Sequence, residues 1–296
     1  MKFTKPATTV DEQIEKLSSR GMAIDDSFAA KKFLNSVSYY RFSGYSLHFE
    51  HFKDGERTHT FKADTQFSNV VSLYNFDSEL RSILFSFIEH IEIAFRTAVI
   101  DILSLQYNNS HWYCDPLLYN PAKFNFDDFI YDCNAEFSRS REVFVQSYKL
   151  KYPDELPPSW MLAEILSLGK WSKVFGGLAK RSDQDAISMR FNAPPWHLQS
   201  WMHSISYLRN LCAHHCRIWN RNLPISPNLT KRQKKSVLYY DRIASVCTVM
   251  ADLLTPMNRK NDLKQQLAEL FTCNKDIPIF KLGFTDNWQE SPIWNA

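Results

Sequence analysis

The chain has 296 residues, of which 44% are hydrophobic and 23% charged, and its formal net charge is +3. This balance is that of a globular protein able to bury a sizeable core. Only 7 glycines are present, which argues against Gly-rich phosphate loops, propellers and turn-dense β folds.

Two short helices are predicted within residues 9–36. Thr9 and Asp26 each precede a segment with hydrophobic residues at helical spacing. Both can act as N-caps, because a short polar side chain accepts a hydrogen bond from a free N–H group of the first helical turn.

An aromatic, half-polar segment follows at residues 38–47, and Gly44 is expected to break it. Residues 51–62 are predicted to form an exposed turn or short hairpin. The basis is Asp54-Gly55, a dipeptide that favours tight turns.

The longest helical pattern runs over residues 67–107. Hydrophobic residues recur there at intervals of three and four, and no proline interrupts them, so we predict one long helix. Within it Glu92 and Arg96 lie four residues apart. This is the spacing of an ordinary intrahelical ion pair, and we interpret the two as structural.

Prolines divide the rest of the chain. Helices are predicted near residues 127–150, from about Ser159, over 196–218 and over 230–253, and the tail contains one further short helix. Trp288 and Trp294 are expected to attach the tail to the body. The fold class is therefore all-α, a multi-helix bundle over residues 65–257, with an N-terminal helical extension (1–64) and a C-terminal extension (258–296).

Export and membrane features are missing from the sequence. No apolar region follows the opening MKFTKPATTV, and no run of about eighteen apolar residues occurs, so neither a signal peptide nor a membrane span is predicted. The six scattered cysteines are expected to be free thiols, and the protein is expected to be cytoplasmic.

Polar groups concentrate in residues 207–221, inside an apolar helical pattern. Residues three and four apart on a helix are neighbours. The stripe predicted on this basis consists of Asn210, His214, Arg217 and Arg221, with Arg209 beside it and Tyr207, Leu211 and Ile218 on the buried side.

These residue types suit metal-free cleavage of RNA, in which the 2′-hydroxyl attacks the adjacent phosphate. The imidazole of His214 can move the proton, and Arg209 can stabilise charge on the phosphate oxygens. Asn210 can orient the imidazole or hold a phosphate oxygen, while Arg217 and Arg221 would position the backbone. These groups suit RNA better than DNA, because DNA lacks the 2′-hydroxyl that acts as the nucleophile.

Basic residues also gather after this segment, and no acidic residue occurs between Asp185 and Asp241. A polyanionic partner is one interpretation, and an ordinary solvated helix face is the other. The basic residues are Arg217, Arg221, Lys231, Arg232, Lys234 and Lys235.

Several segments resemble the Abi-like family of abortive-infection proteins (the AbiD/AbiF group) within the HEPN superfamily. The HEPN ribonuclease signature is Arg, a polar residue, a few others, then His, and Arg209-Asn210-Leu211-Cys212-Ala213-His214 satisfies it. The other matching segments follow in order along the chain: residues 37–45, 76–81 with 88–96, 160–169, and 283–288 with 292–294.

The resemblance implies a toxin of phage defence and an endoribonuclease that needs no cofactor. It also implies a homodimer whose facing motifs form a composite site, and in some relatives a noncoding RNA that restrains the toxin. Tyr40 and Arg41, together with Lys231, Arg232, Lys234 and Lys235, are then candidate RNA contacts.

Other interpretations stay open for single residues. His214 could be structural, and His215 could orient Arg209 or pack at a dimer contact. Trp219, Asn220 and Arg221 are expected to support the helix end. Cys212 and Cys216 could bind a metal, but a closed zinc site needs four ligands and no second pair exists, so no metal is predicted.

Rival functions come from two other classes. The first is a non-catalytic HEPN-like module that binds RNA or protein, and the second is a target or partner of a nucleotide-transferring toxin. Arg190 and His197 have motif-like spacing, but Pro194-Pro195 separates them, so we interpret that pair as coincidence.

Overall fold

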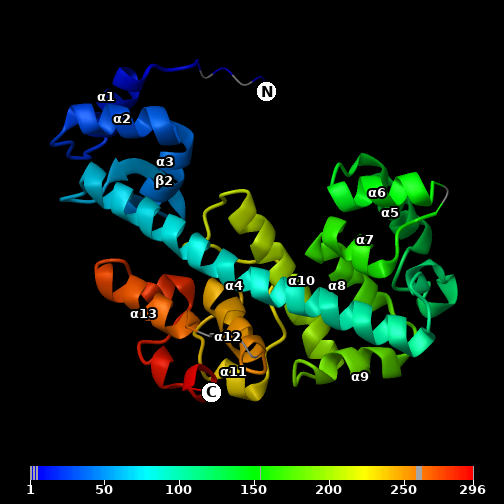
Figure 1. Ribbon diagram of the computed structural model, residues 1–296. Coiled ribbons are helices and arrows are strands. Elements are labelled where there is room, and N and C mark those ends of the chain that lie inside the picture. Colours follow the sequence, from blue (N-terminus) through cyan, green and yellow to red (C-terminus); the bar gives the residue numbers. More distant parts are fainter. Residues whose placement is uncertain (1, 3, 5, 154, 258–261, 296) are drawn as a thin grey trace. The chain divides into compact units, whose positions relative to one another are not determined.

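A computed structural model describes the chain apart from residues 1, 3, 5, 154, 258–261 and 296 (Figure 1). It is predominantly α-helical, as predicted. The chain forms two compact units, residues 1–80 and 81–296. None of the helices described combines the length and apolar character that crossing a bilayer requires.

The longest helix, α4 (Phe67–Tyr107), has the predicted ends and 41 residues. Figure 1 shows it as one unbroken helix, and the division between the two units falls inside it. Its regular pattern of buried residues includes Leu80, Leu84, Ile88, Ile91, Phe95 and Val99.

The first unit contains the start of α4 together with α1 (Val10–Ser19), α2 (Ser27–Val37), α3 (Tyr39–Ser46), β1 (Glu50–Lys53) and β2 (Glu56–Phe61). Both predicted N-caps are confirmed. The Thr9 side chain forms a capping box with Glu12, and the Asp26 carboxylate accepts a hydrogen bond from the Ala29 N–H at 2.9 Å.

The break predicted at Gly44 is wrong, because α3 continues through it. Phe42 and Tyr45 on this helix are buried, and the Tyr45 hydroxyl donates to Asp77 at 2.7 Å. Tertiary packing therefore outweighs the low helix propensity of one glycine. The chain turns earlier, at Ser38, where φ is 69°.

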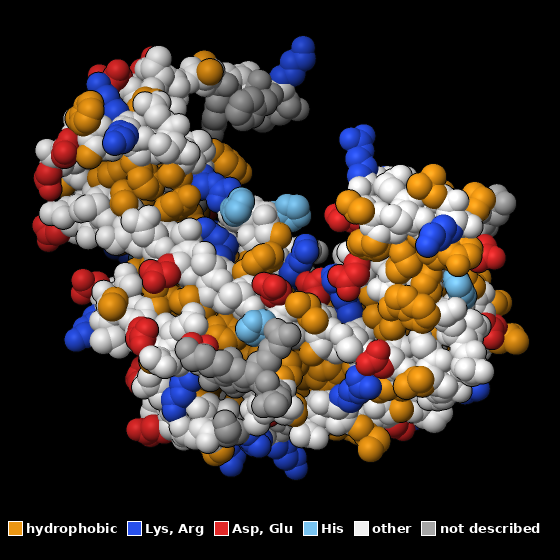
Figure 2. Space-filling model, in the orientation of Figure 1, with side chains coloured by type: hydrophobic (Ala, Val, Ile, Leu, Met, Phe, Trp, Pro, Cys, Tyr) orange, Lys and Arg blue, Asp and Glu red, His pale blue; other side chains and the backbone are white. Residues whose placement is uncertain are grey.

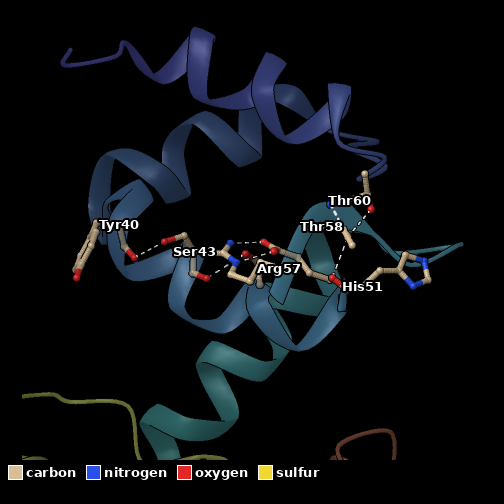
Figure 3. Close-up of polar contacts among 8 residues, drawn as sticks. Tyr40, Ser43, His51, Arg57, Thr58 and Thr60 are labelled. Atoms are coloured by element: carbon tan, nitrogen blue, oxygen red, sulfur yellow. Dashed lines mark hydrogen bonds and ion pairs between the residues drawn. The ribbon is translucent and has the colours of Figure 1, made fainter. Parts of the chain in front are cut away.

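The predicted hairpin is confirmed. Asp54 and Gly55 connect β1 to β2 with φ values of 52° and 82°, the backbone that a tight two-residue hairpin loop requires. The Arg57 guanidinium donates to both carboxylate oxygens of Glu50, at 2.9 and 2.6 Å (Figure 3). This pair ties the two strands together across the sheet.

The second unit holds the remainder of α4 and the later helices. Their bounds are α5 (Phe126–Arg139), α6 (Val143–Lys151), α7 (Ser159–Ile165), α8 (Leu168–Gly177), α9 (Arg181–Met189), α10 (Pro195–Ala213), α11 (Lys231–Lys234), α12 (Ile243–Leu254) and α13 (Leu263–Cys273). Helix α10 contacts α8, α9 and α12. Its buried side carries Leu198, Met202, Ile205 and Leu208.

Two predicted helices are each divided in two. The helix predicted near 127–150 is α5 followed by α6, and the side chains of Gln146 and Lys149 bond the carbonyls of Ser140 and Ser138 at the junction. These bonds satisfy carbonyl groups that lose helical partners where α5 ends.

The helix predicted over 230–253 is α11 and α12, with an irregular segment between them. Val237 forms an antiparallel bridge to Phe284, and the Leu238 N–H donates to the Gly283 carbonyl at 2.8 Å. Pairing of Val237 and Leu238 with the C-terminal tail thus interrupts the helix, which local helical spacing does not reveal.

The tail packs on the second unit, as predicted. Trp288 and Trp294 are buried, and their rings meet edge to face with centroids 4.8 Å apart. Gly283 has φ of 91°, and a Cβ there would lie 2.7 Å from the Cβ of Arg242. This position therefore requires glycine for both its backbone and its close contact.

Exposed hydrophobic side chains gather over α5, α6 and α7, where Figure 2 shows them as orange areas. A patch of this kind is typical of surfaces that bind another chain. The exposed large hydrophobic residues on or directly after these helices are Tyr131, Val143, Phe144, Leu150, Tyr152 and Trp160.

The six cysteines are free thiols, as predicted. Burial raises the pKa of Cys133 to about 12 and also raises the pKa of Cys247 above its ordinary value. Cys273 is exposed.

Candidate active site

The segment predicted to carry the chemistry lies at the C-terminal end of α10. This helix ends at Ala213, and His214 is its C-cap, whereas the prediction continued the helix to about residue 218. Arg217 and Arg221 are therefore not on the helix. The prediction that helical periodicity alone aligns all four polar residues is wrong.

The helix ends in a Schellman motif, which stops it without a glycine. The His215 N–H donates to the Cys212 carbonyl at 3.0 Å, and the Cys216 N–H donates to the Leu211 carbonyl at 2.8 Å. His215 takes the left-handed conformation, with φ of 53°. Glycine usually fills this position, so the sequence offered no clear mark of the helix end.

One face of the last turns of α10 presents Tyr207, Asn210 and His214, which are three and four residues apart. Asn210 and His214 are exposed, and the His214 N–H donates to the Asn210 carbonyl at 3.0 Å. Leu211 and Ile218 are buried, as predicted. Tyr207 is half-buried and shares the exposed face, so its expected burial is wrong.

Arg221 returns to this face through the loop that follows the helix. Its Nη2 donates to the Tyr207 hydroxyl at 3.4 Å, and its Nη1 donates to the Arg217 carbonyl at 3.3 Å. The structure therefore brings Arg221 to the same side of α10 as Asn210 and His214, by a loop rather than by helical spacing.

Arg209 lies on the flank of α10 and faces α4. Its Nε is 3.6 Å from a carboxylate oxygen of Glu92, which is buried and also pairs with Arg96. The intrahelical pair of Glu92 with Arg96 is as predicted. The contact with Arg209 was missed, because nothing in the spacing along the chain links the two helices.

This cluster keeps a net positive charge. Two guanidinium groups share one carboxylate, and about one third of the Arg209 side chain (34%) remains exposed. The Arg209 Cζ also lies 6.0 Å from the centroid of the Phe85 ring. A cation held in this way suits binding of a phosphate, because its position is fixed before the anion arrives.

The loop after the helix is tied to α12. The Asn220 side-chain oxygen accepts a hydrogen bond from Arg242, the N-cap residue of α12, at 2.8 Å. Trp219 beside it is fully buried. The hydrogen bond of Asn220 and the burial of Trp219 fit the supporting role expected of this segment. Arg242 was not predicted to contribute to that support.

The predicted RNA-contact residues lie in both units. Tyr40 of α3 is 89% exposed and its ring points outward in Figure 3, while Arg41 is half-buried. In the second unit four basic side chains are exposed on and beside α11, and one of them, Arg232, lies 3.8 Å from Asp252. The four are Lys231, Arg232, Lys234 and Lys235.

The sequence left two alternatives to compare with the structure: a second motif formed by Arg190 and His197, and a metal site. Arg190 is the C-cap residue of α9 and pairs with Asp101 at 3.3 Å, while His197 lies on α10 after the two prolines. The pair therefore does not form a second motif on one helix. Within the described ranges, no three His, Cys, Asp or Glu side chains are grouped so that they could hold a metal ion.

Comparison with known proteins identifies a family. Residues 32–220 match the family model described as Abi-like protein. This range includes α10 and the loop after it as far as Asn220. No curated protein and no solved structure is significantly similar to the chain. Because the matched range covers more than half of the sequence, the chain belongs to the Abi-like protein family, which indicates a role in abortive-infection defence against phage.

Proposed function

We propose that the chain is a metal-independent endoribonuclease toxin of an abortive-infection system. The observation that carries this proposal is the end of α10, where Asn210 and His214 are exposed beside Arg209, whose guanidinium contacts the buried carboxylate of Glu92. A proton-transfer group, an amide and a fixed cation are thus available together at the protein surface.

The reaction is attack by a ribose 2′-hydroxyl on the adjacent phosphorus. An imidazole accepts the proton of that hydroxyl, the bond from phosphorus to the 5′-oxygen breaks, and the leaving oxygen takes up a proton. The products are a 2′,3′-cyclic phosphate and a 5′-hydroxyl. Arg209 stabilises the charge on the phosphate oxygens, and acid–base terms of this kind contribute roughly 10²–10⁴-fold in rate.

This reaction uses one group as base and another as acid. A homodimer with facing α10 ends would supply His214 twice, once for each role. Arg217 and Arg221 would hold the strand on either side. A noncoding RNA bound to the exposed cations of α11, or to Tyr40 and Arg41 of the first unit, would restrain the toxin by occupying an RNA-binding surface.

The test is cleavage of end-labelled single-stranded RNA in EDTA by the purified chain, beside His214→Ala. His51→Ala serves as the matched control, because His51 is an exposed histidine of the hairpin. We expect cyclic-phosphate products from the parent chain and from the control, and none from His214→Ala. Equal cutting by parent and His214→Ala, or by neither, would remove the assignment.

A second candidate is a non-catalytic module that binds RNA or protein. The observation in its favour is the pairing of Arg209 with Glu92, which an arginine with a purely structural role would also show. This function predicts RNA binding without cutting in the same assay.

A further inference from the structure

A groove of about 850 Å³ lies in the second unit, between α5, α8 and the N-terminal half of α10. Its lining includes three lysines, one tryptophan, one histidine and an aspartate that pairs with a lysine, and none of these belongs to the candidate active site. The residues are Lys123, Asp132, Lys170, Lys173, Trp196 and His203.

Helix α10 connects this groove with the candidate active site. Trp196 and His203 lie on the same face of the helix as Asn210 and His214, because all the steps between successive members of this face are three or four residues. The full series is Trp196, Ser200, His203, Tyr207, Asn210 and His214. With a rise of 1.5 Å per residue, His203 and His214 are separated by roughly 16 Å along the axis.

The groove offers a surface on which a base can stack. Trp196 is 57% exposed, although the Arg181 guanidinium lies 5.2 Å from the centroid of its ring. The cation limits movement of the indole on one side and leaves more than half of the residue accessible. Stacking on such a ring tolerates any base, because every base has a π face.

The groove also offers cations for a phosphate. Lys173 and Lys123 are exposed, whereas Lys170 forms an ion pair with Asp132. Lys170 and Lys173 lie three residues apart on α8 and both line the groove, so two positive charges are on one wall. Burial and the charge of Lys173 lower the pKa of Lys170, while Asp128 acts in the opposite direction. A phosphate bound beside both ammonium groups would reduce their mutual repulsion.

The acidic residues limit what fits. Asp128 and Asp132 line the groove with the three lysines, and Asp132 pairs with Lys170. The groove therefore carries only a small net positive charge and does not form a broad basic surface for a duplex backbone. Its volume is in the range of pockets that hold a single small molecule, such as one nucleotide.

We propose that the groove binds a nucleotide of the same single-stranded RNA whose scissile linkage lies at His214. The base stacks on Trp196, the phosphate lies between Lys170 and Lys173, and the strand follows α10 past His203 and Tyr207. This inference rests on the proposed function, since it assigns the RNA of that reaction a second contact.

The experiment measures binding in a chain that cannot cut. His214→Ala is combined with Trp196→Ala or with Lys173→Ala, and affinity for a fluorescein-labelled single-stranded RNA of roughly ten nucleotides is compared with that for a dinucleotide. The matched controls are Trp160→Ala, an aromatic residue with similar exposure (52%), and Lys151→Ala, an exposed lysine of α6.

We expect each groove variant to weaken binding of the longer RNA about tenfold and to leave dinucleotide binding unchanged. The two controls should bind both RNAs as the parent does. Unchanged affinity of both groove variants for the longer RNA overturns the inference. Because Trp196 and Lys173 are exposed, loss of folding is not expected, and circular dichroism of each variant checks this.

The two proposals fail in different ways. A parent chain that cuts RNA, with groove variants that bind the longer RNA as tightly as His214→Ala alone does, retains the ribonuclease and removes the groove. A parent chain that cuts no RNA but binds it through Trp196 and Lys173 removes the ribonuclease and retains the groove as an RNA site.

Discussion

The Nε of Arg209 lies 3.6 Å from a carboxylate oxygen of Glu92, and this contact joins the candidate active-site segment of α10 to the long helix α4. Glu92 is buried and serves Arg96 as well. The position of the candidate phosphate-binding guanidinium is therefore determined by a residue far from it in the sequence.

Glu92→Gln tests that contact. The amide keeps the shape of the side chain but removes its charge, so Arg209 loses its partner and we expect kcat for RNA cleavage to fall roughly tenfold or more. Arg96 also loses its partner, and because both arginines are partly exposed the loss of stability should be only about 1–2 kcal/mol. Steady-state kinetics and urea unfolding measure the two effects; full activity would contradict the positioning role.

Arg209→Lys keeps the charge but not the planar fork of donors. An ammonium group cannot contact the Glu92 carboxylate and hold phosphate oxygens with the same geometry, so we expect cleavage to fall about a hundredfold. Arg139→Lys is the control, because Arg139 lies at the end of α5 and pairs only locally with Glu136. Activity near that of the parent in Arg209→Lys would show that a point charge suffices.

The two adjacent histidines should respond in opposite ways. His215→Gly removes a side chain from the left-handed position of the helix cap, and we expect stability to change by no more than about 1 kcal/mol with cleavage retained. His214→Ala should lose cleavage with little change in stability, since that side chain is exposed. Thermal unfolding measures the effect on stability, and the RNA assay measures the effect on cleavage. Loss of cleavage in His215→Gly would show that His215, and not His214 alone, takes part in the reaction.

Dilution tests the composite dimer. If each site takes groups from two chains, activity per chain should decrease as the protein is diluted through the dissociation constant of the dimer. Light scattering over the same concentrations should report the change in mass. Constant activity per chain in a monomeric protein would instead mean that a single α10 end is sufficient.

Burial should protect the thiols of Cys133 and Cys247 from alkylation. With its pKa raised to about 12, Cys133 has only about one thiolate in ten thousand molecules at pH 8, and the raised pKa of Cys247 acts in the same direction. Iodoacetamide in native buffer should therefore modify Cys273 first, whereas all the cysteines should react in denaturant. Peptide mass spectrometry identifies the sites, and rapid modification of Cys133 in the native protein would contradict its burial.

Local patterns predicted the elements that local interactions define. The ends of α4, the caps at Thr9 and Asp26 and the turn at Asp54-Gly55 each depend on neighbouring residues, and each is confirmed. Gly44 failed as a helix breaker because the aromatic residues around it are held by contacts with other elements.

Local sequence patterns predicted part of the candidate site but not all of it. The spacing of Asn210 and His214 put them on one face, but a Schellman motif with histidine in place of glycine left the end of α10 unmarked. The return of Arg221 to Tyr207 depends on a loop, and the reach of Glu92 to Arg209 depends on helix packing. Neither contact follows from a regular spacing of residues along the chain.

The cap at the end of α10 also bears on how this protein could diverge. Main-chain groups of residues 211–216 make its hydrogen bonds, so mutations that exchange most side chains there would leave the imidazole at 214 where it is. Within this cap, position 215 is constrained by its left-handed backbone. We therefore expect related sequences to have only glycine, asparagine, aspartate or histidine there.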